Sequence, residues 1–200
     1  IQVGIEKFSV FRAIRAIERA DIAVLLLDAA ELASSQDTHI AGYVLDAFKG
    51  LIVVVNKWDL AEELELTEQE CRLMIQSRFK FAPFAPVLFT SGLTGDGLPD
   101  LMKTAWEVYD SCRSRVSTGM LNRIIERAAG ENLPRMVGRR RLHLLYATQS
   151  GVSPPTFVFF VNDPKLLHFT YRRYLENRLR DEFDFTGTPL RFIFKSRSEQ

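Results

Sequence analysis

Two hundred residues with 46% hydrophobic content suffice for one large core or two modest ones, and the net charge of +1 gives no overall bias toward a charged partner. The longest apolar runs have the length of strands, and the first residues lack a charged region followed by an apolar stretch. This argues against a membrane-spanning helix and a signal peptide, and predicts a cytoplasmic protein with no membrane partner. Cys71 and Cys112 lie outside any C-x-x-C spacing, so neither a zinc site nor a disulfide framework is expected.

The charge is unevenly distributed along the chain. Residues 1–110 hold 10 Lys or Arg and 17 Asp or Glu, a net charge of −7, whereas residues 111–200 hold 16 and 8, a net charge of +8. We interpret the change of sign as a boundary between two domains with different partners, the basic one facing phosphate or nucleic acid. The alternative is that the two halves attract each other.

The first half alternates between helical and strand patterns. Continuously apolar runs, as in a buried parallel strand, follow segments in which apolar residues recur at helical spacing. Helices are predicted at about 5–20, 35–48, 67–79 and 98–111, and strands at 22–28, 51–55 and 87–90. This order predicts an α/β fold, a parallel sheet with helices on both faces, whose ligands bind beyond the carboxyl ends of the strands.

The order of elements changes after Ser111. Ser117 or Thr118 can cap a helix that runs to about Ala129 and is ended by Gly130. Strands are predicted at 142–149 and 156–161, then a helix at 165–183 with Asp163 as its cap and Pro164 at its first position, and a strand at 190–195. The order predicts a small α+β unit with a three-stranded sheet.

The residues Asn56-Lys57-Trp58-Asp59 end the apolar run 51–55, and an N-K-x-D at this position can recognise guanine. The Asp59 carboxylate can accept the N1 and N2 hydrogens of guanine together, which adenine cannot offer. Asn56 can meet N7 and tie the loop to its neighbours, and Lys57 can lay its methylene stem over the purine. Trp58 is expected to pack within the loop, although its main chain would line the base pocket. The alternative is a polar strand-to-helix turn.

A second strand pattern opens into a small-residue loop at Ser91-Gly92-Leu93, where backbone N–H groups can approach a ligand closely. This segment resembles the S-A-K or S-A-L pattern of the GTPase superfamily, with Gly in place of Ala, and the resemblance implies that its amides bind guanine O6. Two such loops at consecutive strand ends favour a nucleotide site. Asp28 also ends a strand, but it is predicted to form a turn.

The candidates for contact with RNA phosphates form a basic stretch in the second half. They are Arg135, Arg139, Arg140 and Arg141. A solvated basic turn is the competing interpretation. No residue pattern predicts a catalytic group or a metal site.

Several longer runs resemble the bacterial double GTPases called Der or EngA, and the resemblance covers essentially the whole chain. The runs include Asn56-Lys57-Trp58-Asp59-Leu60, Tyr146-Ala147-Thr148-Gln149, Val161-Asn162-Asp163-Pro164 and Arg173-Tyr174-Leu175-Glu176-Asn177. The resemblance implies the later part of a second P-loop-type GTPase domain (1–112) followed by a KH-like domain (113–200). It also implies binding of GTP or GDP and a partner in the large ribosomal subunit or its rRNA, with no DNA partner expected.

The chain departs from this family in the phosphate-binding motifs. It contains no G-x-x-x-x-G-K-[ST] loop, which cradles the phosphates and helps to hold Mg²⁺, and its first half lacks the D-x-x-G that ends the next strand. Mg²⁺ is therefore expected in the intact protein but has no ligands among these residues, and GTP hydrolysis cannot be assigned to them. The chain resembles a fragment of the family's proteins.

Two other functions remain open. An Era-like GTPase would carry a true KH domain, but the basic half contains no G-x-x-G, the loop that clamps nucleic-acid backbone. An RNA- or protein-binding module with an inactive nucleotide fold is the second alternative.

Overall fold

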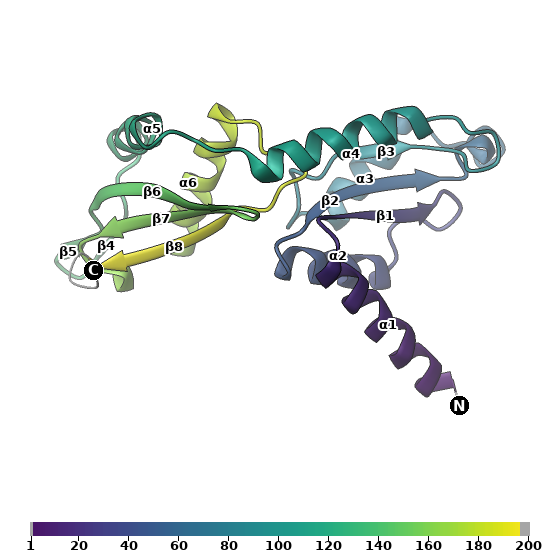
Figure 1. Cartoon of the computed structure of the whole chain (residues 1–200), viewed down its shortest axis with the longest axis horizontal. Coiled ribbons are helices and arrows are strands. Elements are labelled where there is room, and N and C mark those ends of the chain that lie inside the picture. The colour runs from purple at the N-terminus through teal and green to yellow at the C-terminus, as the bar shows by residue number, and fades with distance from the viewer. Residues whose placement is uncertain (1, 197–200) are drawn as a thin grey trace. The chain divides into compact units, whose positions relative to one another are not determined.

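The computed structural model describes residues 2–196, with side chains from residue 10 onward, and these form two compact units (Figure 1). Unit 1 comprises the residues up to Ser111 together with Thr186–Pro189, and unit 2 comprises Cys112–Phe185 and the residues from Leu190 onward. Ile1 and residues 197–200, which the expected domains include, lie outside the described residues. Among the described residues, no helix is both long and apolar enough to cross a membrane.

Unit 1 contains a parallel three-stranded sheet in the order β1-β2-β3. The strands are β1 (Ile22–Asp28), β2 (Gly50–Asn56) and β3 (Val87–Phe89). All residues of β2 except Asn56 are buried, which is expected for a central strand covered on both faces. The parallel register places the carboxyl ends of β1 and β2 side by side, with Asp28 opposite Asn56.

Four α-helices accompany this sheet in unit 1, and they begin and end within a few residues of the predicted ranges. They are α1 (Gln2–Arg19), α2 (Ser35–Asp46), α3 (Glu68–Arg78) and α4 (Leu98–Arg113), with a short 3₁₀ turn η1 (Trp58–Leu60) after β2. Ser34 and Thr67 form capping boxes at the starts of α2 and α3. One core joins apolar residues of α2, α3 and β2, including Val44, Ile75 and Val53.

A short segment distant in sequence, Thr186–Pro189, also belongs to unit 1. The N–H of Leu51 donates to the Gly187 carbonyl over 2.8 Å, and the N–H of Gly187 donates to the Phe84 carbonyl over 2.8 Å. Gly187 has φ +67°, and a methyl group there would come within 2.5 Å of a methyl of the buried Val108. Only glycine fits this position, which extends the hydrogen bonding at the start of β2.

Unit 2 contains the expected three-stranded sheet, in which β6 (Leu144–Val152) and β7 (Pro155–Val161) are antiparallel and β8 (Arg191–Ser196) is parallel to β7. Phe157 and Phe159 point to the same side of β7 and are fully buried. They belong to a core that also contains apolar residues of the two helices α5 (Thr118–Glu131) and α6 (Phe169–Glu182). The predicted mixed α/β architecture is confirmed.

Three local predictions for unit 2 were wrong. Gly130 lies inside α5, which continues to Glu131, so this glycine does not end the helix. Asp163 and Pro164 begin only the 3₁₀ turn η2 (Pro164–Leu166), and α6 starts three residues later with His168 as its N-cap, whose ring accepts from the N–H of Thr170. The stretch between the two predicted strands 142–149 and 156–161 is partly strand, because β6 extends to Val152 and β7 begins at Pro155.

The basic stretch contains a hairpin that the sequence patterns did not predict. Strands β4 (Met136–Val137) and β5 (Arg140–Arg141) pair in antiparallel register, with Gly138 at φ +62° in the two-residue turn between them. Asn162 secures the base of the hairpin, because its side chain donates to the Arg141 carbonyl over 2.8 Å and accepts from the His143 N–H over 2.9 Å. The hairpin therefore has a fixed base and an exposed tip.

Candidate nucleotide site and basic hairpin

The two loops singled out in the sequence follow adjacent strands, β2 and β3, and come together at the carboxyl edge of the sheet. Asn56 joins them: its side-chain oxygen accepts from the N–H of Gly92 over 3.0 Å and from the hydroxyl of Thr90 over 3.3 Å. The backbone adds a further bond, from the N–H of Trp58 to the carbonyl of Thr90, over 3.0 Å. Asn56 thus holds the second loop in place, as its amide chemistry allows.

Asp59 and Ser91 form the second connection between the loops. The Ser91 hydroxyl donates to Asp59 Oδ1 and accepts from the N–H groups of Leu93 and Thr94, over 3.2 and 3.1 Å. The Asp59 side chain is exposed, while Ser91 is buried. Because a carboxylate has about four acceptor positions, Asp59 can accept this hydroxyl and still accept two more hydrogens from a ligand. Its orientation is fixed by the protein before a ligand arrives.

Lys57 lies at the start of the η1 turn in the left-handed backbone conformation, with φ +62° and ψ +36°. Its ammonium contacts Asp28 Oδ2 at 2.6 Å, and both side chains are partly exposed. The hydrogen bond from Lys57 lowers the pKa of Asp28 below its ordinary value, and the same bond raises the pKa of Lys57. Both groups are therefore charged at neutral pH.

The remaining residues of the two loops differ in exposure. The Trp58 ring is partly buried and packs on Phe89, with ring centroids 4.4 Å apart, while Leu93 is among the most exposed apolar side chains. A methyl group at Gly92 would lie 3.7 Å from Asn56 Oδ1, an ordinary contact, so the alanine of the superfamily pattern would fit there. The geometry of the loop therefore tolerates the departure from that pattern.

Sequence reasoning missed two residues of this cluster. Asp28 was interpreted as a turn residue, and its Oδ1 does accept from the Ala30 N–H over 3.0 Å, but its Oδ2 holds Lys57. Thr90 is buried and bonds to Asn56. The sequence feature that could have identified Asp28 as a site residue is its position at the end of a parallel strand next to β2.

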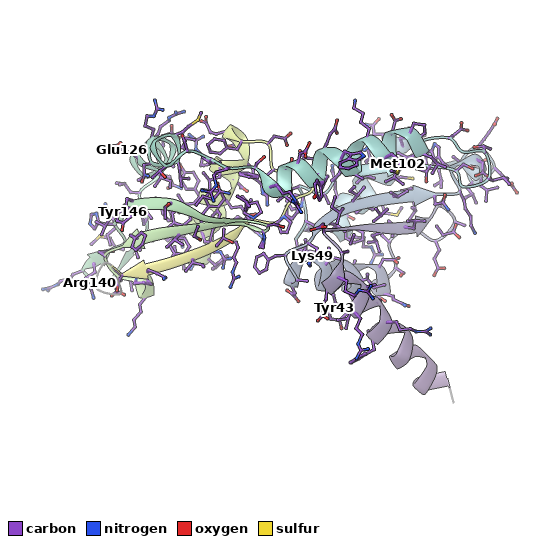
Figure 2. The ribbon with its side chains drawn as sticks, viewed as in Figure 1. Tyr43, Lys49, Met102, Glu126, Arg140 and Tyr146 are labelled. Atoms are coloured by element: carbon purple, nitrogen blue, oxygen red, sulfur yellow. The ribbon has the colours of Figure 1, made fainter. Side chains whose placement is uncertain are left out.

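The four candidate arginines of unit 2 are not equivalent. Arg135, Arg139 and Arg140 are exposed, and Arg140, on the hairpin (Figure 2), keeps 64% of its side chain exposed while its guanidinium lies 3.2 Å from Asp163. Arg141 is partly buried, and its Nε has no hydrogen-bond partner among the described residues. The exposed tip of the hairpin thus carries Arg139 and Arg140 next to the apolar Met136 and Val137.

The described residues contain no cluster of three or more His, Cys, Asp or Glu side chains that could hold a metal ion. The sequence contains no glycine-rich loop of the kind that binds a phosphate chain. The arrangement presents the exposed Asp59 carboxylate at the carboxyl edge of the sheet, held by the buried Ser91 hydroxyl.

Comparison with known proteins identifies both units. Residues 3–111 match the elongation factor Tu GTP binding domain, and residues 115–195 match the C-terminal KH-domain-like unit of EngA bacterial GTPase enzymes. The second match favours the Der or EngA resemblance over an Era-like protein.

Two relatives named GTPase Der match the whole chain. The relative from Clostridium botulinum (strain Langeland) is 45% identical over 200 residues, and the relative from Clostridium perfringens (strain SM101) is 47% identical over 199 residues. The chain covers 46% and 45% of these proteins, so it spans about half the length of the curated relatives.

A solved structure, the cytosolic domain of the T. maritima FeoB iron transporter in apo form, is 25% identical with a TM-score of 0.35. The matched region covers 45% of this chain and 32% of the FeoB chain, and the likeness is too low to support a fold assignment. The assignment rests instead on the two family matches. The chain belongs to the elongation factor Tu GTP binding domain family, and it carries in addition the KH-like unit of the EngA bacterial GTPases.

Proposed function

We propose that the chain is the guanine-binding and KH-like part of a Der-type GTPase that assists assembly of the large ribosomal subunit. The proposed boundary between its domains lies near residue 112, in agreement with the two family matches. The single observation that supports guanine binding best is the double connection between the two loops, from Asn56 to Gly92 and from Ser91 to Asp59. This arrangement fixes a carboxylate and a row of backbone N–H groups together at the edge of a parallel sheet.

Each part of the cluster has a role in this proposal. Asp59 accepts the N1 and N2 hydrogens of guanine, Asn56 meets N7, and Lys57 lies over the face of the purine. The N–H of Gly92, which donates to Asn56 Oδ1 in the structure, would be shared with guanine O6. Adenine presents an amino group in place of O6 and lacks the N2 hydrogens, so both loops discriminate against it.

Binding of nucleotides to the full-length protein tests this proposal. GDP is expected to displace a fluorescent guanine nucleotide at concentrations at least about 100-fold lower than ADP, because a buried or preorganised polar group left unpaired costs about 1–3 kcal/mol and adenine leaves several unpaired. Equal displacement by GDP and ADP would exclude a guanine-specific site. Hydrolysis of GTP and its Mg²⁺ requirement belong to the whole protein, whose phosphate ligands lie outside these residues.

We propose further that the hairpin formed by β4 and β5 contacts ribosomal RNA. Arg139 and Arg140 are exposed on a structure with a fixed base, and unit 2 holds the basic excess of the chain. Two-stranded ribbons with arginines at the tip can approach phosphates without rearrangement of the fold. Asp163 pairs with Arg140 and so lowers the net charge of the hairpin, but its ion pair does not involve Arg139.

Replacement of both Arg139 and Arg140 by Ala is expected to weaken binding of ribosomal RNA and to reduce the slope of log affinity against log salt by about 2, because each phosphate contact contributes about 1. Filter binding of the full-length protein across a salt series measures both quantities. The matched control replaces Arg172 and Arg173, two exposed arginines of α6, and removes the same charge elsewhere in unit 2. Equal losses in both variants would indicate a general charge effect and would refute a hairpin contact.

A further inference from the structure

We propose that Asp28 is a positioning residue for the nucleotide site, because it holds the Lys57 ammonium so that the lysine stem stays over the guanine-binding position. The inference rests on the proposed function of the two loops. It gives a role in binding to a residue that belongs to neither motif and lies 29 positions before Lys57 in the sequence.

The two oxygens of Asp28 have separate partners. Oδ1 accepts from the N–H of Ala30 over 3.0 Å, and Oδ2 contacts the Lys57 ammonium at 2.6 Å. The backbone bond fixes the plane of the carboxylate, so Oδ2 is presented in one direction. A carboxylate that is held in one orientation can position a flexible side chain. A freely rotating carboxylate would instead move with that side chain.

The strands place Asp28 and Lys57 close together without help from either side chain. Asp28 is opposite Asn56 in the parallel register of β1 and β2, and the N–H of Ala29 donates to the Asn56 carbonyl over 3.0 Å. Lys57 follows Asn56 directly, in a left-handed conformation at the start of η1. The ion pair therefore bridges two strand ends that the sheet already holds in place.

A fixed lysine lowers the cost of binding. A free lysine side chain has rotamer entropy, part of which is lost when its stem is laid over a base. Asp28 orders the ammonium end before the nucleotide arrives, so less entropy is lost on binding. Because the pair is partly exposed, this contribution is small compared with that of Asp59, which contacts the base edge directly.

A double-mutant cycle on the full-length protein tests the inference, with GDP affinity as the measurement. Asp28→Asn keeps an oxygen for the Ala30 N–H but removes the charge that holds Lys57. GDP affinity is expected to fall about threefold in Asp28→Asn and about tenfold in Lys57→Ala, and the double variant is expected to equal Lys57→Ala, since Asp28 acts through the lysine. Asp46→Asn, which removes a charge from an exposed position near the end of α2, is the matched control.

The outcomes separate this inference from the proposed function. If Asp28→Asn leaves GDP affinity unchanged, or lowers it as much in the Lys57→Ala background as in the wild type, Asp28 does not act through Lys57 and the inference is overturned. If Asp59→Asn and Asn56→Ala also leave GDP affinity unchanged, the guanine site itself is wrong. A loss in Asp28→Asn that shrinks as salt is raised supports the ion pair, because a role in the turn with Ala30 would not depend on salt.

Discussion

Replacing Asp59 by Asn is expected to lower the affinity of the full-length protein for GDP by about 100-fold or more and to raise its affinity for the xanthine nucleotide XDP. The amide of Asn can accept the N1 hydrogen of guanine, but its NH₂ group then faces the N2 amino group, donor against donor. The loss of a charge-assisted bond and the unpaired donors together cost about 3 kcal/mol, which corresponds to a factor of about 100 or more.

Xanthine provides the complementary test, because it carries an oxygen at C2 where guanine carries an amino group. Asn at position 59 would accept the N1 hydrogen through its carbonyl oxygen and donate to that oxygen through its NH₂ group. The Ser91 hydroxyl can still donate to the amide oxygen, as it donates to Asp59 Oδ1 in the native protein, so the loop connection persists. The variant therefore exchanges one hydrogen-bond pattern for another without loss of the local fold.

Competition between GDP, XDP and ADP for one fluorescent nucleotide measures this change of preference, and Asp46→Asn again controls for the lost charge. A variant that loses affinity for all three nucleotides equally would indicate a damaged fold rather than altered base recognition. Unchanged preference for GDP would show that Asp59 does not contact the base. Only the exchange of GDP for XDP identifies this carboxylate as the group that recognises the N1 and N2 positions.

Much of the fold follows from short-range patterns in the sequence. The buried strand β2 is apolar along nearly its whole length, and the capped helices α2 and α3 lie within two residues of their expected limits. These elements are long enough for periodicity to identify them. The two loops of the candidate site were also expected at adjacent strand ends, because parallel strands bring their carboxyl ends to one edge.

The features that the sequence did not predict depend on contacts between distant residues or on very short elements. The hairpin has strands of two residues each, too short for an alternating pattern, and its base is held by Asn162, about 20 residues away. Asp28 pairs with Lys57 across two strands, and Gly187 bonds to Leu51 from far along the chain. No local pattern encodes these partners, because they are brought together only when the sheet forms.

Replacing Gly97 by Ala is expected to destabilise unit 1 by about 3 kcal/mol, because two separate costs combine at this position. Gly97 has φ +73°, a conformation that costs an alanine about 1 kcal/mol. A methyl group there would also collide with the carbonyl oxygen of Phe89 and approach the Phe89 carbonyl carbon and Thr90 Cα to 3.2 Å. These are backbone atoms at the end of β3, which cannot move aside as a flexible side chain could.

Gly95→Ala provides a matched control for this prediction. Gly95 lies in the same loop at φ +87°, but a methyl group there would meet no atom within 4 Å, so only the backbone cost of about 1 kcal/mol applies. The two tryptophans of the chain, Trp58 and Trp106, both belong to unit 1, so their fluorescence during urea unfolding reports on this unit alone. Equal destabilisation by the two substitutions would refute the predicted collision with β3.

The same substitution links the stability of unit 1 to the candidate site. The N–H of Ser91 donates to the Asp96 carbonyl over 3.0 Å, directly before Gly97, so a shift of the backbone at Gly97 moves the loop that carries Ser91 and Gly92. Gly97→Ala is therefore expected to weaken GDP binding by about tenfold in molecules that remain folded, whereas Gly95→Ala changes it little. Full GDP affinity in folded Gly97→Ala protein would show that the second loop does not need its native position to bind the nucleotide.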